Sequence, residues 1–120
     1  MLRYALALSG ADGILTAFLH EDALVYAGYS AGPCVLGPTL RGFEIVDDVA
    51  AVPSIYGTEP VWNGLAILDY VIVPHVDSPD HPETDRCAAV ADRLRADGVP
   101  YQTLRDGQAI VVDGPDTTLR

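Results

Sequence analysis

The segment G-Y-S-A-G, residues 28–32, places a serine between two glycines directly after the apolar run of residues 23–27. This pattern is typical of a nucleophile elbow, in which a sharp strand-to-helix bend lifts the serine hydroxyl clear of the sheet. Ser30 is therefore the candidate nucleophile for acyl transfer, which requires a base to take its proton. The N–H of Ala31, at the start of the following helix, could donate to an oxyanion. The same pentapeptide also fits an ordinary turn.

Three histidines, His20, His75 and His81, could supply the base. His75 is favoured because it follows Pro74 at the carboxyl end of a buried apolar strand, where α/β sheets place their sites. His20 lies at the end of an amphipathic helix, and His81 lies in a loop rich in proline and aspartate. We therefore expect His75 to lie within hydrogen-bonding reach of Ser30.

A histidine base also needs a carboxylate that fixes its tautomer. The candidates are Asp77, Asp80, Glu83 and Asp106. Asp106 stands at a strand end, although an Asp-Gly pair also suits a tight turn without any further role. The residues alone leave this choice open.

A metal site is the alternative use of the same region, because His75, Asp77, His81 and Asp85 are plausible ligand types. The intervening prolines and the absence of a recognisable ligand spacing count against it. We expect neither a metal nor a cofactor.

Length and composition indicate one domain spanning residues 1–120, with 49% hydrophobic residues and a net charge of −10. Seven basic residues, all arginine, face seventeen acidic ones, which argues against nucleic acid and anionic membranes as partners. No apolar run approaches the roughly 18 residues of a membrane span. Two distant cysteines are too few for a disulfide framework, so we expect a cytoplasmic location.

Hydrophobic patterns predict helices alternating with strands, and therefore an α/β fold with a partly parallel sheet. The predicted helices cover residues 2–9, a segment capped by Asp12, a short stretch after Ser30, and residues 85–97. The last helix has an apolar inner face made of Cys87, Val90, Ala91 and Leu94, and residues 37–64 are predicted to be mainly loop. The predicted strands are residues 23–28, 43–46, 70–73, 100–104 and 108–112, the last two joined as a hairpin by residues 105–107.

Three stretches together resemble the peptidase E family of aspartyl-dipeptidase-like serine peptidases. They read VYAGYSAGPCVLGPTLRG, LDYVIVPHVDSPDHPET and TLRDGQAIVVDG, and they cover nearly the whole chain in order. The resemblance implies a class I glutamine amidotransferase-like, Rossmann-like three-layer α/β fold. It also implies that Ser30 is the nucleophile, His75 the base and Asp106 the third member of a triad. Founding members carry Glu at the position of Asp106, one methylene longer.

The resemblance also implies that half of the family fold is missing, because full-length relatives have about twice as much chain. Their N-terminal half supplies parallel strands and a glycine-rich loop that gives a second oxyanion donor. Without that half, apolar side chains would be partly uncovered, so we expect a homodimer or another homo-oligomer. The side chains expected to be uncovered are Leu2, Leu6, Phe18, Leu19, Val25, Ala27, Val71 and Val73.

The function predicted from these features is a serine peptidase that cleaves small peptides through an acyl-enzyme, with dipeptides of the Asp-X type as one substrate class. Arg86 and Arg41 are the basic residues that could hold a substrate carboxylate. The alternative is a catalytically silent, truncated homologue with a binding or assembly role.

Overall fold

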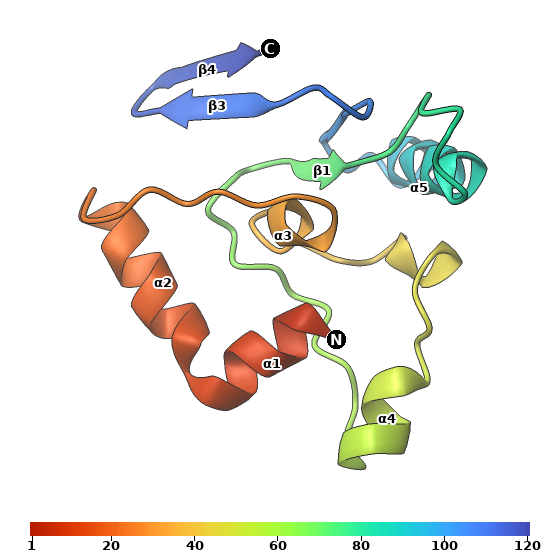
Figure 1. Cartoon of the computed structure of the whole chain (residues 1–120). Helices are drawn as coiled ribbons and strands as arrows, with labels where there is room; N and C mark the ends of the chain where they lie inside the picture. The colour runs from red at the N-terminus through yellow and green to blue at the C-terminus, as the bar shows by residue number, and fades with distance from the viewer.

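A parallel pair of short strands, β1 (Val71–Val73) and β2 (Tyr101–Thr103), forms the centre of the computed structural model, which describes residues 1–120. Val71 pairs with Tyr101 and Val73 with Thr103. The connection between the strands contains helix α5 (Thr84–Ala96), so the unit is a β–α–β crossover (Figure 1). This confirms an α/β fold with a parallel sheet.

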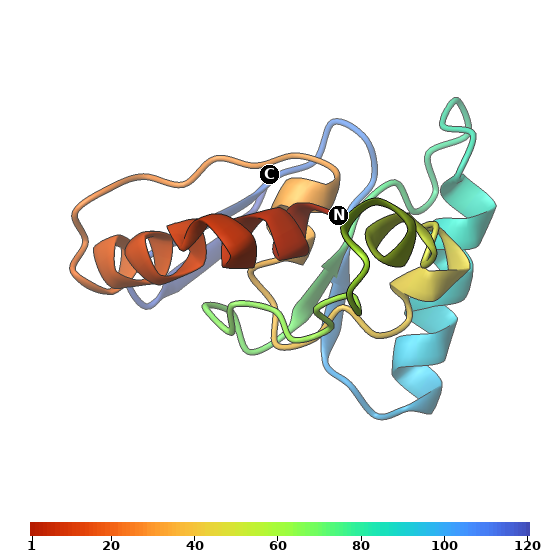
Figure 2. The ribbon, with the colours of Figure 1, turned by 90° about the horizontal axis from the view of Figure 1, so that it is seen from below.

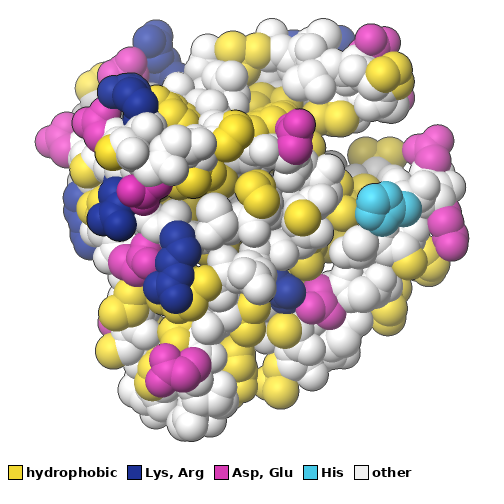
Figure 3. Space-filling model, turned by 180° about the vertical axis from the view of Figure 1, so that it is seen from behind, with side chains coloured by type: hydrophobic (Ala, Val, Ile, Leu, Met, Phe, Trp, Pro, Cys, Tyr) yellow, Lys and Arg dark blue, Asp and Glu magenta, His cyan; other side chains and the backbone are white.

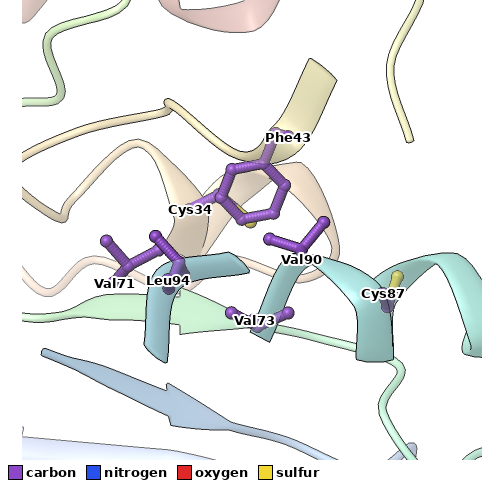
Figure 4. Close-up of a cluster of buried hydrophobic side chains, with 7 residues drawn as sticks. All are labelled: Cys34, Phe43, Val71, Val73, Cys87, Val90 and Leu94. Carbon is purple, nitrogen blue, oxygen red and sulfur yellow. The ribbon is translucent and has the colours of Figure 1, made fainter. Parts of the chain in front are cut away.

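Helix α5 supplies most of one wall of the core. Four of its apolar residues recur at helical spacing and are buried: Cys87, Val90, Ala91 and Leu94. This matches the face predicted from the sequence. Cys87, Val90 and Leu94 belong to one cluster of seven buried side chains (Figure 4). The other four are Val71 and Val73 of β1, Cys34 of α3 (Ala31–Cys34) and Phe43. Val71 and Val73 are therefore fully buried, and the prediction that they would be uncovered is wrong.

The two N-terminal helices extend to one side of the central strands (Figure 2). Helix α1 (Leu2–Ser9) ends at Gly10, whose φ of 74° is the left-handed conformation that favours glycine, and α2 (Ala11–His20) follows. Asp12 lies inside α2 rather than at its cap, and its carboxylate accepts a hydrogen bond from Arg3. No single helix has the length and hydropathy of a membrane span; α1 and α2 reach them only as a pair bent by 90°.

Residues 23–28 were predicted as a buried strand, and this prediction is wrong. The segment is extended but belongs to no strand, and residues 24–28 make no backbone–backbone hydrogen bond (Figures 1 and 2). Val25 is 94% exposed and Tyr29 is 88% exposed. An apolar sequence alone cannot make a strand, because the backbone needs a neighbouring strand to bond with.

The middle of the chain also differs from the sequence prediction. Residues 43–46 were predicted as a strand, whereas Phe43–Ile45 form a 3₁₀ helix, η1, whose Phe43 is buried against α5. Helix α4 (Ala51–Tyr56), in a region predicted as loop, begins two residues before Pro53. Proline is tolerated there, because the first turn of a helix needs no N–H donor.

The C-terminal hairpin lies one strand later than predicted. β3 (Ile110–Asp113) pairs antiparallel with β4 (Asp116–Leu119), whereas β2 pairs with β1, so residues 105–107 join two different sheets. The turn between β3 and β4 contains Gly114, whose φ is 56°. Seen from behind, a notch at the right lies between this hairpin, at the upper right, and the surface directly below it (Figure 3).

We expect the chain to self-associate through the face that contains residues 23–29. Only 13 of 120 residues are buried, and large apolar side chains remain exposed on α1, α2 and this segment. Val25→Asp costs the isolated chain little because the side chain is already exposed. Burying valine is worth about 1.5–3 kcal/mol, so the change should weaken a dimer about tenfold or more in sedimentation at low micromolar concentration.

Ile55→Asp, at an exposed position on α4, is the matched control and should leave association unchanged. A cooperatively folded 12.8 kDa monomer with no dimer would contradict this expectation.

Candidate functional site

The parallel register of β1 and β2 brings two distant segments to one edge of the sheet. The backbone pairing continues past both strands: the N–H of Leu104 donates to Val73 at 2.9 Å, and the N–H of Val76 donates to Leu104 at 3.0 Å. His75 follows the first strand and Asp106 the second. These bonds hold the two residues beside each other although 31 positions separate them.

His75 and Asp106 form the central contact of the site. Nδ1 of His75 lies 2.6 Å from Oδ1 of Asp106. A carboxylate only accepts, so Nδ1 of the imidazole carries a proton, and in the neutral ring the lone pair is then on Nε2. Nε2 is buried and has no hydrogen-bond partner. The ring is therefore oriented with an unoccupied basic nitrogen, which is what a general base requires.

Ser30 adopts a strained backbone conformation at the start of α3, with φ 52° and ψ −115°. Such a conformation costs a non-glycine residue about 1–3 kcal/mol and persists only where its surroundings hold it. Tyr26 supplies part of that support, because its hydroxyl donates to the carbonyl of Gly32 at 2.8 Å. A Cβ on Gly28 would lie 3.2 Å from the Gly32 carbonyl carbon and 2.9 Å from the Tyr26 ring. Glycine at position 28 thus permits the tight bend.

One cavity of about 190 Å³ is lined by both Ser30 and His75. Most of the other lining side chains are apolar, and Ala31 also lines it. The hydrogen bond expected between Ser30 and His75 is not formed, since Nε2 has no partner. Catalytic hydrogen bonds are often long without substrate and tighten in the complex. The missing bond therefore does not exclude Ser30 and His75 as a nucleophile and base that line one cavity.

His81 lies against His75, a contact that sequence reasoning missed. The two rings stack with centroids 3.7 Å apart and planes within 8°. Nδ1 of His81 accepts the N–H of Glu83 at 3.2 Å, which fixes the second ring. The sequence placed His81 in a loop, and only the folding of residues 76–80 brings it back over His75.

The other carboxylate candidates do not contact His75. Asp77 is largely exposed and lies 3.8 Å from Arg105, and Glu83 pairs with Arg86 at 3.0 Å. Asp80 is exposed at a turn. No three His, Cys, Asp or Glu side chains form a group that could hold a metal ion, so the alternative set of His75, Asp77, His81 and Asp85 does not converge.

The two arginines predicted to bind substrate are engaged elsewhere. Nε of Arg86 donates to the carbonyl of Ile45 at 2.8 Å, in addition to the pairing with Glu83. The Arg41 guanidinium lies 4.4 Å from the centre of the Trp62 ring. Neither arginine lines the cavity that contains Ser30, whereas Trp62 does.

The electrostatics of the site favour a charged Asp106 and a neutral Cys34. The hydrogen bond from His75 holds the pKa of the Asp106 carboxyl below its usual value, so the carboxylate is ionised at neutral pH. Burial raises the pKa of the Cys34 thiol to about 12, and its Sγ lies 3.3 Å from the carbonyl oxygen of Ser30. Cys34 lines the cavity but is not a thiolate nucleophile.

Comparison with known proteins identifies one family and one fold. The sequence model of Peptidase family S51 matches residues 2–120. A 1.5 Å crystal structure of a candidate peptidase E protein from Listeria monocytogenes EGD-e superposes with a TM-score of 0.80 at 18% identity. The match covers 99% of this chain and 53% of the Listeria chain, so this chain spans about half the length of that protein. A search of curated proteins finds no match.

We expect the carboxyl carbon of Asp106 to titrate by NMR with a midpoint below 3.8, and His75→Ala to return it towards that value. Because the folded pKa is the lower one, the stabilisation from this contact is present above pH 3.8 and is lost as the pH falls through the lowered pKa. His20→Ala, at the end of α2, is the control and should not change the midpoint. A midpoint that is the same with and without His75 would contradict the contact.

Proposed function

We propose that this chain, which belongs to peptidase family S51, provides a Ser30–His75–Asp106 triad for the hydrolysis of small peptides. Membership confirms the resemblance to peptidase E and indicates a peptidase hydrolase. The observation that carries the assignment of residues is the oriented His75, which binds Asp106 through Nδ1, has no partner at Nε2, and lines the same cavity as Ser30.

In the proposed reaction, Oγ of Ser30 attacks the scissile carbonyl while Nε2 of His75 takes the hydroxyl proton. The imidazolium that forms is stabilised by the Asp106 carboxylate. His75 then gives the proton to the leaving amine as the C–N bond breaks, which leaves an ester on Ser30. A water molecule, deprotonated by His75, hydrolyses the ester and restores the free serine.

The backbone N–H of Ala31 is the proposed oxyanion donor, because it follows Ser30 at the start of α3 and lines the same cavity. An oxyanion hole normally has a second donor, and removing one donor costs about 10²–10³ in turnover. We propose that the chain forms part of a class I glutamine amidotransferase-like fold. The second oxyanion donor would then come from segments that correspond to the other half of the Listeria structure, or from a second copy of the chain.

The proposed substrates are small peptides with an apolar or uncharged group at the reacting residue. A mostly apolar cavity of about 190 Å³ favours such groups. An Asp-X preference would need Arg86 to leave the Ile45 carbonyl and Glu83, or Arg41 to leave Trp62. Both cysteines are free and buried, which agrees with the cytoplasmic location we propose.

A fluorophosphonate probe tests the nucleophile directly. We expect covalent labelling of the wild-type chain at Ser30 and none of Ser30→Ala, because only an activated serine attacks phosphorus at a useful rate. His75→Ala should also abolish labelling. Ser54→Ala removes a hydroxyl on α4 that bonds only within its own helix, so labelling should be unchanged. Labelling that persists in folded Ser30→Ala would contradict the proposal by showing another nucleophile, and no labelling of the wild-type chain would favour a silent homologue.

A further inference from the structure

The loop after His75 needs support from outside its own backbone. His75 and Asp77 both have left-handed backbone conformations, with φ of 63° and 54°. Each costs a non-glycine residue about 1–3 kcal/mol, so the loop would relax unless other groups held it. A relaxed loop would move the imidazole away from Asp106.

Two hydroxyl side chains hold this loop. Oγ1 of Thr84, at the start of α5, accepts the N–H of Ser78 at 3.0 Å and donates to the carbonyl of His75 at 2.7 Å. Oγ of Ser78 accepts the N–H of Asp106 at 2.8 Å. Ser78 is 2% exposed and is the one buried polar side chain in the protein.

We propose that Ser78 and Thr84 are positioning residues that fix His75 and Asp106 relative to each other, an assignment that rests on the proposed function. Thr84 fixes the backbone on which the imidazole is carried, and Ser78 fixes the turn on which the carboxylate is carried. Through the bond between Thr84 and Ser78, helix α5 becomes the common support of both groups.

The same segment carries the stacked ring of His81. The N–H of His81 donates to the carbonyl of Ser78 at 2.8 Å, and the N–H of Thr84 donates to that of His81 at 3.2 Å. The ring that packs on His75 is thus set by the two residues that set the loop. The stacking keeps the imidazole from tilting out of its plane, and the hydrogen bond to Asp106 restricts its rotation.

A kinetic double-mutant cycle separates positioning from general stability. Ser78→Ala leaves the Asp106 N–H without its partner, and Thr84→Val leaves both the Ser78 N–H and the His75 carbonyl unpaired. We expect each to lower kcat about ten- to a hundredfold at unchanged KM, because the loss in rate from a catalytic group displaced by about 1 Å is of that order. Thr84→Ser should restore most of kcat, and Ser54→Ala is the matched hydroxyl control.

The cycle's second arm is Asp106→Asn. If Ser78 acts through Asp106, Ser78→Ala should cost little in the Asp106→Asn background. Full additivity of the two losses, or a rise in KM alone, would overturn the proposal.

An NMR measurement on the free protein tests positioning without relying on activity. The Nδ1 proton of His75, hydrogen-bonded to Asp106, should give a protected signal in the wild-type chain and in Ser54→Ala. It should exchange faster in folded Ser78→Ala and Thr84→Val, and recover in Thr84→Ser. An unchanged signal in both folded variants would overturn the proposal. A changed signal in a chain that no probe labels would support positioning and contradict the peptidase function.

Discussion

The parallel pairing of β1 with β2 is the constraint on which the candidate site depends. In this register the carboxyl ends of both strands meet at one edge, and the backbone bonds of Leu104 to Val73 and Val76 extend the pairing into the following loops. Only then can the imidazole of His75 and the carboxylate of Asp106 approach to 2.6 Å. The burial of Val71 and Val73 against α5 fixes that register, since a slip of one residue would turn both side chains away from the cluster.

The second half of the site depends on backbone strain rather than on pairing. Ser30 keeps its unfavourable φ because Tyr26 and the close approach of Gly28 to Gly32 leave the bend little freedom. The preceding segment, by contrast, is an unpaired apolar stretch with Val25 in solvent. The contacts of Tyr26 and Gly28 with Gly32 therefore hold the bend itself, whereas the backbone of residues 24–28 makes no backbone hydrogen bond and is open to a neighbouring strand.

The sequence predicts this site better than it predicts the sheet around it. Local signals were sufficient for the bend at Ser30, the apolar face of α5 and the position of His75 after a buried strand. The contact of Asp106 with His75 was suggested by the family resemblance, since the residues alone also allowed Asp77, Asp80 or Glu83. Strand pairing is a non-local property, so residues 23–28 and 43–46 were wrongly predicted as strands, and the hairpin was placed one strand early. The stacking of His81 on His75 and the bonds of Ser78 depend on loop geometry that no residue pattern encodes.

The proposed mechanism requires Nε2 of His75 to take the proton from the hydroxyl of Ser30. A crystal structure of the chain after reaction with a fluorophosphonate tests it most directly. The account predicts a phosphonyl group on Oγ of Ser30, with Nε2 of His75 within roughly 2.6–3.2 Å of an adduct oxygen and Nδ1 still on Asp106. An adduct on another residue, or one on Ser30 with Nε2 of His75 turned away and still without a partner, would contradict it.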